Sequence, residues 1–183
     1  MGFFDDLPAP EPAPPRRHHH PWELPEAEFP GIVPIDTLLL ARTDSVAVAV
    51  TGLSAFSAGI EIFLTARMRP SAGDPEEHLA ASRRSFRFGL QFSDGAKAAA
   101  SPGARPDRDS EPTAPLLYMF AGGGGPHSFV SRWWAWPLPP AGPLEFVCEW
   151  PAFGIGESRA AIDAQLILDA AARSTRLWPE SES

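Results

Sequence analysis

The stretch Ser128–Trp150, SFVSRWWAWPLPPAGPLEFVCEW, holds two apolar segments joined by a proline-rich connector. Because side chains alternate between the two faces of a strand, Phe129–Trp136 is apolar on both faces and Leu144–Trp150 on only one. A strand that is apolar on both faces is normally covered on both. We therefore expect Phe129–Trp136 to be a central strand and Leu144–Trp150 to be its neighbour, with one face in water.

Two further segments have the alternation of half-buried strands. Aliphatic side chains fall on one face of residues 60–68, while Glu61, Thr65 and Arg67 fall on the other, with Phe63 among them. Residues 85–92 place three phenylalanines and a leucine on one face. Shorter apolar runs predict further strands at residues 37–41, 46–52, 116–120 and 159–162.

A helix is expected near the C-terminus. Asp163 is a suitable N-cap, and the residues up to about Arg173 are good helix formers. Residues 74–77 also resemble a helix start, but any helix after them is expected to be short and exposed. We expect the C-terminal helix to cover the second apolar face of Phe129–Trp136, and Trp178 to anchor the chain beyond it. The whole pattern predicts a mainly β fold: an antiparallel β-sandwich, immunoglobulin-like or jelly-roll-like, with the C-terminal helix packed on one sheet.

The domain boundaries follow from where proline and glycine gather. Residues 1–30 hold too few apolar side chains to offset the entropy of ordering, so they predict a disordered proline-rich arm. One β-sandwich domain is expected over residues 31–179, with a flexible loop at 96–114 and an acidic tail at 180–183.

Two apolar islands interrupt the arm. The first contains Phe3, Phe4 and Leu7 around two aspartates, and the second contains Trp22. Each island is expected either to bind a partner or to lie back on the domain, and a fraying terminus is the structural alternative.

Charge and composition exclude several classes of function. The 183 residues carry 15 Lys and Arg against 23 Asp and Glu, a net charge of −8. Such a charge argues against a nucleic-acid binder and against docking on an anionic membrane. Cys148 is the only cysteine, so no internal disulfide is possible. With no apolar run near the ~18 residues that span a bilayer and no signal-peptide pattern, we expect a soluble cytoplasmic protein.

The glycine run Gly122–Gly125, followed by His127, is the strongest candidate for a ligand site. Consecutive glycines allow backbone amides to surround an anion, and a histidine can act as an acid or a base. Gly123, Gly124 and His127 are the candidate ligand-binding residues. The run lacks the lysine of a P-loop and the spacing of a dinucleotide fingerprint, so a flexible hairpin tip is the structural alternative.

Two acidic or nucleophilic candidates have structural explanations. Glu145 and Glu149 share a strand face about 13 Å apart, which is farther than the roughly 5–9.5 Å between the two carboxyl groups of a glycosidase. Cys148 has apolar neighbours, which is typical of an inert core thiol. The sequence therefore predicts no catalytic residue.

Two clusters could in principle hold a metal ion or a sugar. His18, His19 and His20 have no structured ligand set after them, so we expect no metal site and no cofactor. Residues Arg132, Trp134 and Trp136 would form a stacking strip if exposed, and belong to the core if the helix covers them.

Three segments, SFRFGLQFSDG, RWWAWPLPPAGPLEFVCEWPAFGI and DAQLILDAAARSTRLWP, stand in a chain rich in alanine, arginine, proline and glycine. In these segments the chain resembles a group of actinobacterial proteins over roughly residues 20–179. The resemblance implies a shared sandwich-like core. No activity or ligand is assigned to that group, so the resemblance gives no residue a role.

In the absence of a catalytic constellation, the sequence predicts a non-enzymatic protein-interaction module. It would bind an unidentified protein partner through its proline-rich arm or an aromatic surface patch, and its predicted partner-binding residues are Phe3, Phe4, Leu7 and Trp22.

Two alternatives remain open. One is a protein or enzyme that binds a small molecule or an anion with residues 122–125 and His127. The other is a carbohydrate-binding sandwich, which requires an exposed Trp134 or Trp136.

Overall fold

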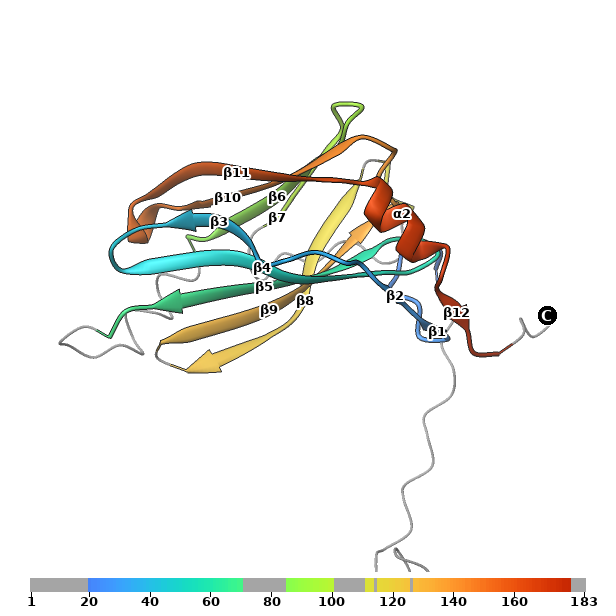
Figure 1. Cartoon of the computed structure of the whole chain (residues 1–183), viewed down its shortest axis with the longest axis horizontal. Coiled ribbons are helices and arrows are strands. Elements are labelled where there is room, and N and C mark those ends of the chain that lie inside the picture. The colour runs from blue at the N-terminus through green and yellow to red at the C-terminus, as the bar shows by residue number, and fades with distance from the viewer. Residues whose placement is uncertain (1–19, 71–84, 101–110, 114, 126, 179–183) are drawn as a thin grey trace, which may run out of the picture.

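The computed structural model describes residues 20–70, 85–100, 111–113, 115–125 and 127–178. Two antiparallel sheets lie one above the other, and the core fills the space between them (Figure 1). The described residues are therefore mainly β with one short α-helix near the C-terminus, as the alternation of apolar side chains predicts. The helix start expected at residues 74–77 lies outside them.

The larger sheet has six strands. Its order is β2 (Gly31–Ile32), β4 (Val46–Ala55), β5 (Ile60–Met68), β9 (Ser128–Trp136) and β8 (Leu116–Gly125), and β3 (Leu38–Arg42) pairs beside β2 along β4.

The smaller sheet has four strands, in the order β11 (Ile155–Asp163), β10 (Pro143–Trp150), β6 (Arg87–Gln91) and β7 (Lys97–Ala100). The two sheets approach each other at their edges, where β3 lies along β11 and the Ser158 hydroxyl donates to the Leu40 carbonyl.

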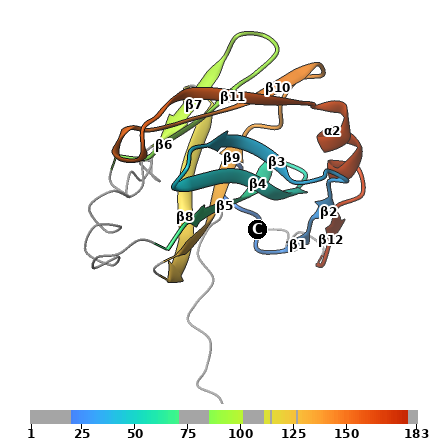
Figure 2. The ribbon, with the colours of Figure 1, turned by 60° about the vertical axis from the view of Figure 1, so that its left-hand side comes forward.

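A two-stranded sheet and the C-terminal helix close one end of the sandwich. Here β1 (Glu28–Phe29) pairs with β12 (Thr175–Arg176), next to α2 (Gln165–Ala171) (Figure 2). The short helix η1 (Pro151–Phe153) connects β10 to β11. The helix packs against β2 and β4 so closely that a Cβ on Gly31 would lie 1.9 Å from the carbonyl oxygen of Ala170.

Large aromatic side chains from both sheets meet in the core. Trp133 of β9 is fully buried, and its ring centroid lies 5.2 Å from that of Phe88 in β6. Phe88 also stacks on Phe146 of β10. Burying side chains of this size contributes most of the hydrophobic stabilisation, at about 25 cal/mol per Å² of apolar surface.

The prediction for the strand Phe129–Trp136 is confirmed, because β9 lies between β5 and β8. The alternation of Leu144–Trp150 is also confirmed: every second residue of β10 is buried. Its expected position beside β9 is wrong, since β10 lies between β6 and β11 in the other sheet. The connector of residues 137–142 carries the chain across the sandwich instead of folding it back as a hairpin.

The C-terminal helix packs on one sheet as expected, and it ends at Ala171, close to the expected end. Its expected position is wrong, because it closes the end of the sandwich rather than covering the outer side of β9. Trp178 does not anchor the chain, because 58% of its surface is exposed. A short helix that buries Ile167, Ala170 and Ala171 fits the narrow end between two sheets, where a wide apolar face is not needed.

The predicted domain limits need two corrections. Part of the expected arm belongs to the fold, since residues 28–29 form β1, and part of the expected loop 96–114 is the strand β7. Residues 101–110 and 114 of that loop, and the acidic tail 180–183, lie outside the described residues.

Candidate functional site

The two sheets present different outer surfaces. The first we name the arginine face: the outer side of the six-stranded sheet around Leu39, Phe63, Thr65, Arg67, Phe120, Val130 and Arg132. The second we name the paired-charge face: the outer side of the four-stranded sheet around Arg87, Gln91, Lys97, Glu145, Glu149, Glu157 and Arg159. The strand registers place each set on one side of its sheet, except that Phe120, which lies at a bulge of β8, is placed by its contact with Arg132.

A buried carboxylate lies at one end of the arginine face. Glu61 of β5 has only 4% of its side chain exposed, and Arg132 of β9 donates to it through Nε. This hydrogen bond raises the pKa of Arg132 above its usual value. A buried carboxylate needs such a partner, since an unpaired charge away from water is costly.

The Arg132 guanidinium makes cation–π contacts with two aromatic rings. Its central carbon lies 5.5 Å from the ring centroid of Phe63 and 5.1 Å from that of Phe120, which is the range of cation–π contacts. Within the described residues, nothing accepts a hydrogen bond from its two terminal nitrogens. The guanidinium is therefore oriented, 46% exposed and able to bind a carboxylate from outside with its free nitrogens.

The surface beside Arg132 carries no other charge until its far end, where cations lie. Val130 and Leu39 are exposed on this surface, Thr51 and Thr65 share a hydrogen bond, and the other neighbouring positions of β4 and β8 are alanine and glycine. Arg67 and Arg42 lie farther along β5 and β3, where both are register partners of Ala47 in β4. Neither forms an ion pair with another described residue. The only acid on this face of the strands is the buried Glu61, although Asp44 lies in the adjoining turn.

The opposite end of the arginine face is covered by the chain itself. Trp134 of β9 is fully buried, and its indole nitrogen donates to the carbonyl of Trp22 at 2.8 Å. Phe56 packs edge-on against the same ring, and Gly59 allows it to lie close to the backbone. The Trp22 ring stacks on His20 at 4.5 Å. The segment that starts at His20 therefore covers Trp134, in the place where the C-terminal helix was expected.

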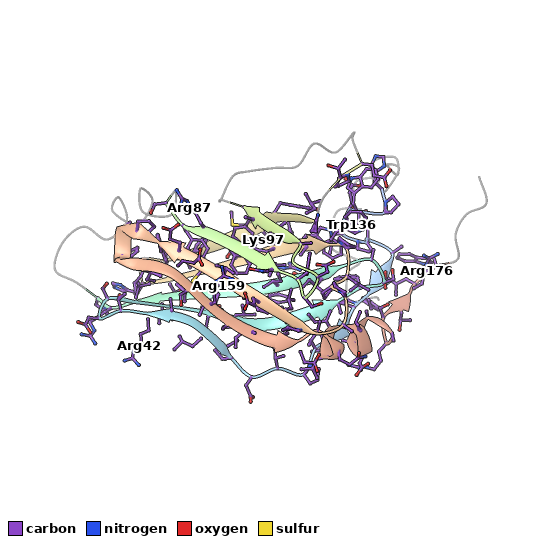
Figure 3. The ribbon with its side chains drawn as sticks, turned by 90° about the horizontal axis from the view of Figure 1, so that it is seen from above. Arg42, Arg87, Lys97, Trp136, Arg159 and Arg176 are labelled. Atoms are coloured by element: carbon purple, nitrogen blue, oxygen red, sulfur yellow. The ribbon has the colours of Figure 1, made fainter. Side chains whose placement is uncertain are left out.

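On the paired-charge face the charged side chains neutralise one another. Arg87 contacts Glu149 at 2.9 Å, and Arg159 contacts Glu145 at 2.6 Å and Glu157 at 2.8 Å. The hydrogen bonds to Glu157 and Glu145 raise the pKa of Arg159. Figure 3 looks onto this face, from which Arg87, Lys97 and Arg159 project. They surround a shallow hollow of about 220 Å³.

The predicted glycine loop is a strand. Residues Gly122–Gly125 belong to β8 and pair with Ser128–Ser131 of β9, and His127 follows in the exposed turn. The structure thus brings Gly123, Gly124 and His127 to one hairpin end without the loop on which the anion hypothesis depended. Ligand binding by these three residues stays a prediction.

Most of the predicted partner-binding residues cannot be placed. Phe3, Phe4 and Leu7 lie outside the described residues. Trp22 packs on the domain, which was one of the two expectations for its island, and its contact with a partner stays a prediction.

The expectations for the tryptophans and the thiol are confirmed where the structure tests them. Trp134 is core, so it forms no exposed stacking strip, and Trp136 is partly buried. Cys148 is 1% exposed, and burial raises the pKa of its thiol to about 11. A thiol in this state is a poor nucleophile at neutral pH.

Sequence reasoning missed the pair of Glu61 and Arg132. Glu61 was expected on a face in water, and Arg132 was considered only beside tryptophans. The available signal was one charge of each sign inside two otherwise apolar strands. Their pairing depends on the register between β5 and β9, which the sequence does not reveal.

Two further searches of the described residues were negative. No group of three or more histidine, cysteine, aspartate or glutamate side chains is placed to hold a metal ion. No helix in the same part of the chain is long and apolar enough to cross a membrane.

Comparison of the chain with protein-family models, with curated proteins and with solved structures found no match in any of the three. The resemblance to the actinobacterial group accordingly stays an expectation, and the arguments below rest on the geometry of the two faces.

Proposed function

We propose that this protein is a non-enzymatic interaction module that binds an acidic, apolar segment of another protein on its arginine face. The single observation that carries the proposal is the environment of Arg132. Its guanidinium contacts Glu61, Phe63 and Phe120, while its terminal nitrogens have no acceptor among the described residues. An oriented arginine among aromatic and aliphatic side chains is the composition that interface hot spots favour.

Charge supports the same choice of surface. The whole chain carries a net charge of −8, yet Arg42, Arg67 and Arg132 share a face whose one strand carboxylate is buried. An acidic segment would be repelled by most of the molecule and attracted here, which gives orientation and a faster encounter. Its apolar side chains would cover Val130 and Leu39.

The cytoplasm is the proposed compartment. It is supported by the single cysteine, which is buried and leaves the fold independent of an oxidising environment.

A display selection of random 12-residue peptides on the full chain tests the proposal. We expect enrichment of peptides in which a phenylalanine, tryptophan or leucine is flanked by aspartate or glutamate. Arg67→Glu should weaken their binding at least tenfold, because it reverses a charge on the arginine face. Lys97→Glu makes the same reversal on the paired-charge face and should leave binding unchanged. No enrichment, or equal effects of the two variants, would refute the proposal.

A further inference from the structure

We infer that the arginine face binds the chain's own N-terminal island, residues 3–7, and that this intramolecular contact competes with the partner. The inference rests on the proposed function, since it names a ligand for the same face. The island has the sequence FFDDL, in which Phe3, Phe4 and Leu7 surround Asp5 and Asp6.

The arm joins the domain on the side of the arginine face. The described chain begins at His20, and Trp22 lies against Trp134, whose ring belongs to the outer side of β9. The Glu61–Arg132 pair is next to it, because Glu61 is the register partner of Trp134. The segment that carries the island is therefore joined to the domain at the covered end of the arginine face.

The connecting chain is long enough. Residues 8–19 separate the island from His20, and at ~3.1 Å per residue they reach up to about 37 Å. The way along β5 from Glu61 to Arg67 is six residues, or about 20 Å at ~3.3 Å each. The island can reach every position of the arginine face without strain in the connection.

The chemistry of the island matches this face and not the other. Two aspartates can pair with Arg67 and with the terminal nitrogens of Arg132, and two phenylalanines and a leucine can cover Val130 and Leu39. On the paired-charge face the arginines already contact Glu145, Glu149 and Glu157, so aspartates would meet carboxylates. Charge complementarity thus selects one face of the sandwich.

The tether makes even a weak contact effective. A short linker that can span the face holds its end at an effective concentration on the order of 1 mM. An island with a dissociation constant of about 100 µM would then be bound most of the time, and a competing partner would bind roughly tenfold more weakly. The arm thereby sets the affinity, or the concentration, that a partner needs in order to displace it from the arginine face.

Paramagnetic relaxation in the full chain tests the contact directly. Gly2→Cys accepts a nitroxide label next to the island, while the buried Cys148 stays unlabelled. We expect loss of amide signal at Thr65, Arg67 and Val130, and recovery of the signal when Asp5 and Asp6 are changed to lysine. No loss at these amides, or an equal loss at Gln91 and Lys97, would overturn the inference.

A competition measurement separates this inference from the proposed function. The probe is a fluorescein-labelled synthetic peptide of residues 1–12, titrated into the full chain and into the Phe3→Ser, Phe4→Ser variant. We expect the variant to bind the peptide about tenfold more tightly, because its own island no longer competes. If both bind equally, or if the peptide binds neither while display-selected peptides still depend on Arg67, the inference fails and the proposed function stands. If no peptide depends on Arg67, the proposed function fails as well.

Discussion

The charged side chains on the outer faces of the two sheets have opposite pairing patterns. On the paired-charge face, arginines and glutamates lie in water and contact one another. On the arginine face the one strand carboxylate is buried under its arginine, and the remaining cations have no described partner. Exposed pairs contribute little to stability and leave nothing for a partner to bind, whereas a buried pair constrains the fold and keeps an oriented cation at the surface.

The largest difference between the faces should appear when one arginine is removed from each. Arg132→Met leaves the Glu61 carboxylate unpaired, and we expect a loss of about 2–3 kcal/mol in the free energy of unfolding, below the 3–5 kcal/mol of fully buried pairs because Arg132 is half-exposed. Arg159→Met exposes carboxylates that are already in water, and its urea midpoint should stay close to that of the wild type.

Removing the carboxylate as well checks the cause. In the double variant Glu61→Met, Arg132→Met no unpaired charge stays buried, so we expect most of the loss in the free energy of unfolding to be recovered in urea unfolding. A double variant that is as unstable as Arg132→Met would mean that the packing of the arginine side chain, and not the buried charge, is what the single variant removes.

The thiol on the inner side of the four-stranded sheet should make the stability of the fold sensitive to alkaline pH. Burial raises the pKa of Cys148 from 9.0 to about 11. The folded-state pKa is thus above the unfolded one, so the stabilisation is complete below pH 9 and is lost as the pH rises to 11, by about 2 kcal/mol. Cys148→Ala should remove this part of the pH dependence. Identical slopes in the two proteins would contradict the burial of the thiol.

Two neighbouring glycines test whether the end of β8 is a strand. A Cβ on Gly124 would lie 2.0 Å from the Ser128 carbonyl oxygen, while one on Gly123 meets nothing within 4 Å. We expect Gly124→Ala to cost about 1–2 kcal/mol in urea unfolding, and Gly123→Ala to be neutral or slightly stabilising. Equal tolerance of both changes would favour the flexible tip that was the alternative for this run.

The smallest effect concerns the covered end of the arginine face. Trp22→Ala removes the partly buried ring that stacks on His20, and we expect a loss of about 1 kcal/mol. Trp134 should then become more accessible to acrylamide quenching, whereas Trp133 stays protected in the core. A quenching constant equal to that of the wild type would show that Trp22 does not shield Trp134.

The alternation of apolar residues is enough to predict the longer strands and the side that faces the core. In β5, β6 and β10 the apolar positions predicted to face the core are buried, except for the partly buried Met68, because a period of two is a local property of the chain. Glu61 and Gly89 are buried in addition. The sheet to which each strand belongs is not local. The position of β10 in the opposite sheet depends on the path of the connector 137–142. The position of α2 is determined by the space at the end of the sandwich and not by the most hydrophobic strand.

The candidate site was less accessible to sequence reasoning for the same reason. Arg132 and Glu61 are 71 residues apart, and only the register of β5 against β9 brings them together. A glutamate in a half-apolar strand is normally a residue in water. Here Trp22, far away in the sequence, covers the neighbouring Trp134, and no periodicity indicates that cover.

Hydrogen–deuterium exchange of the full chain, with and without a display-selected acidic peptide, tests the central claim most directly. The account predicts slower exchange in β5 and β9, at residues 60–68 and 128–136, and no change in β6 and β10, at residues 87–91 and 143–150. Protection of β6 and β10 with β5 and β9 unchanged would contradict it, because the binding surface would then be the paired-charge face.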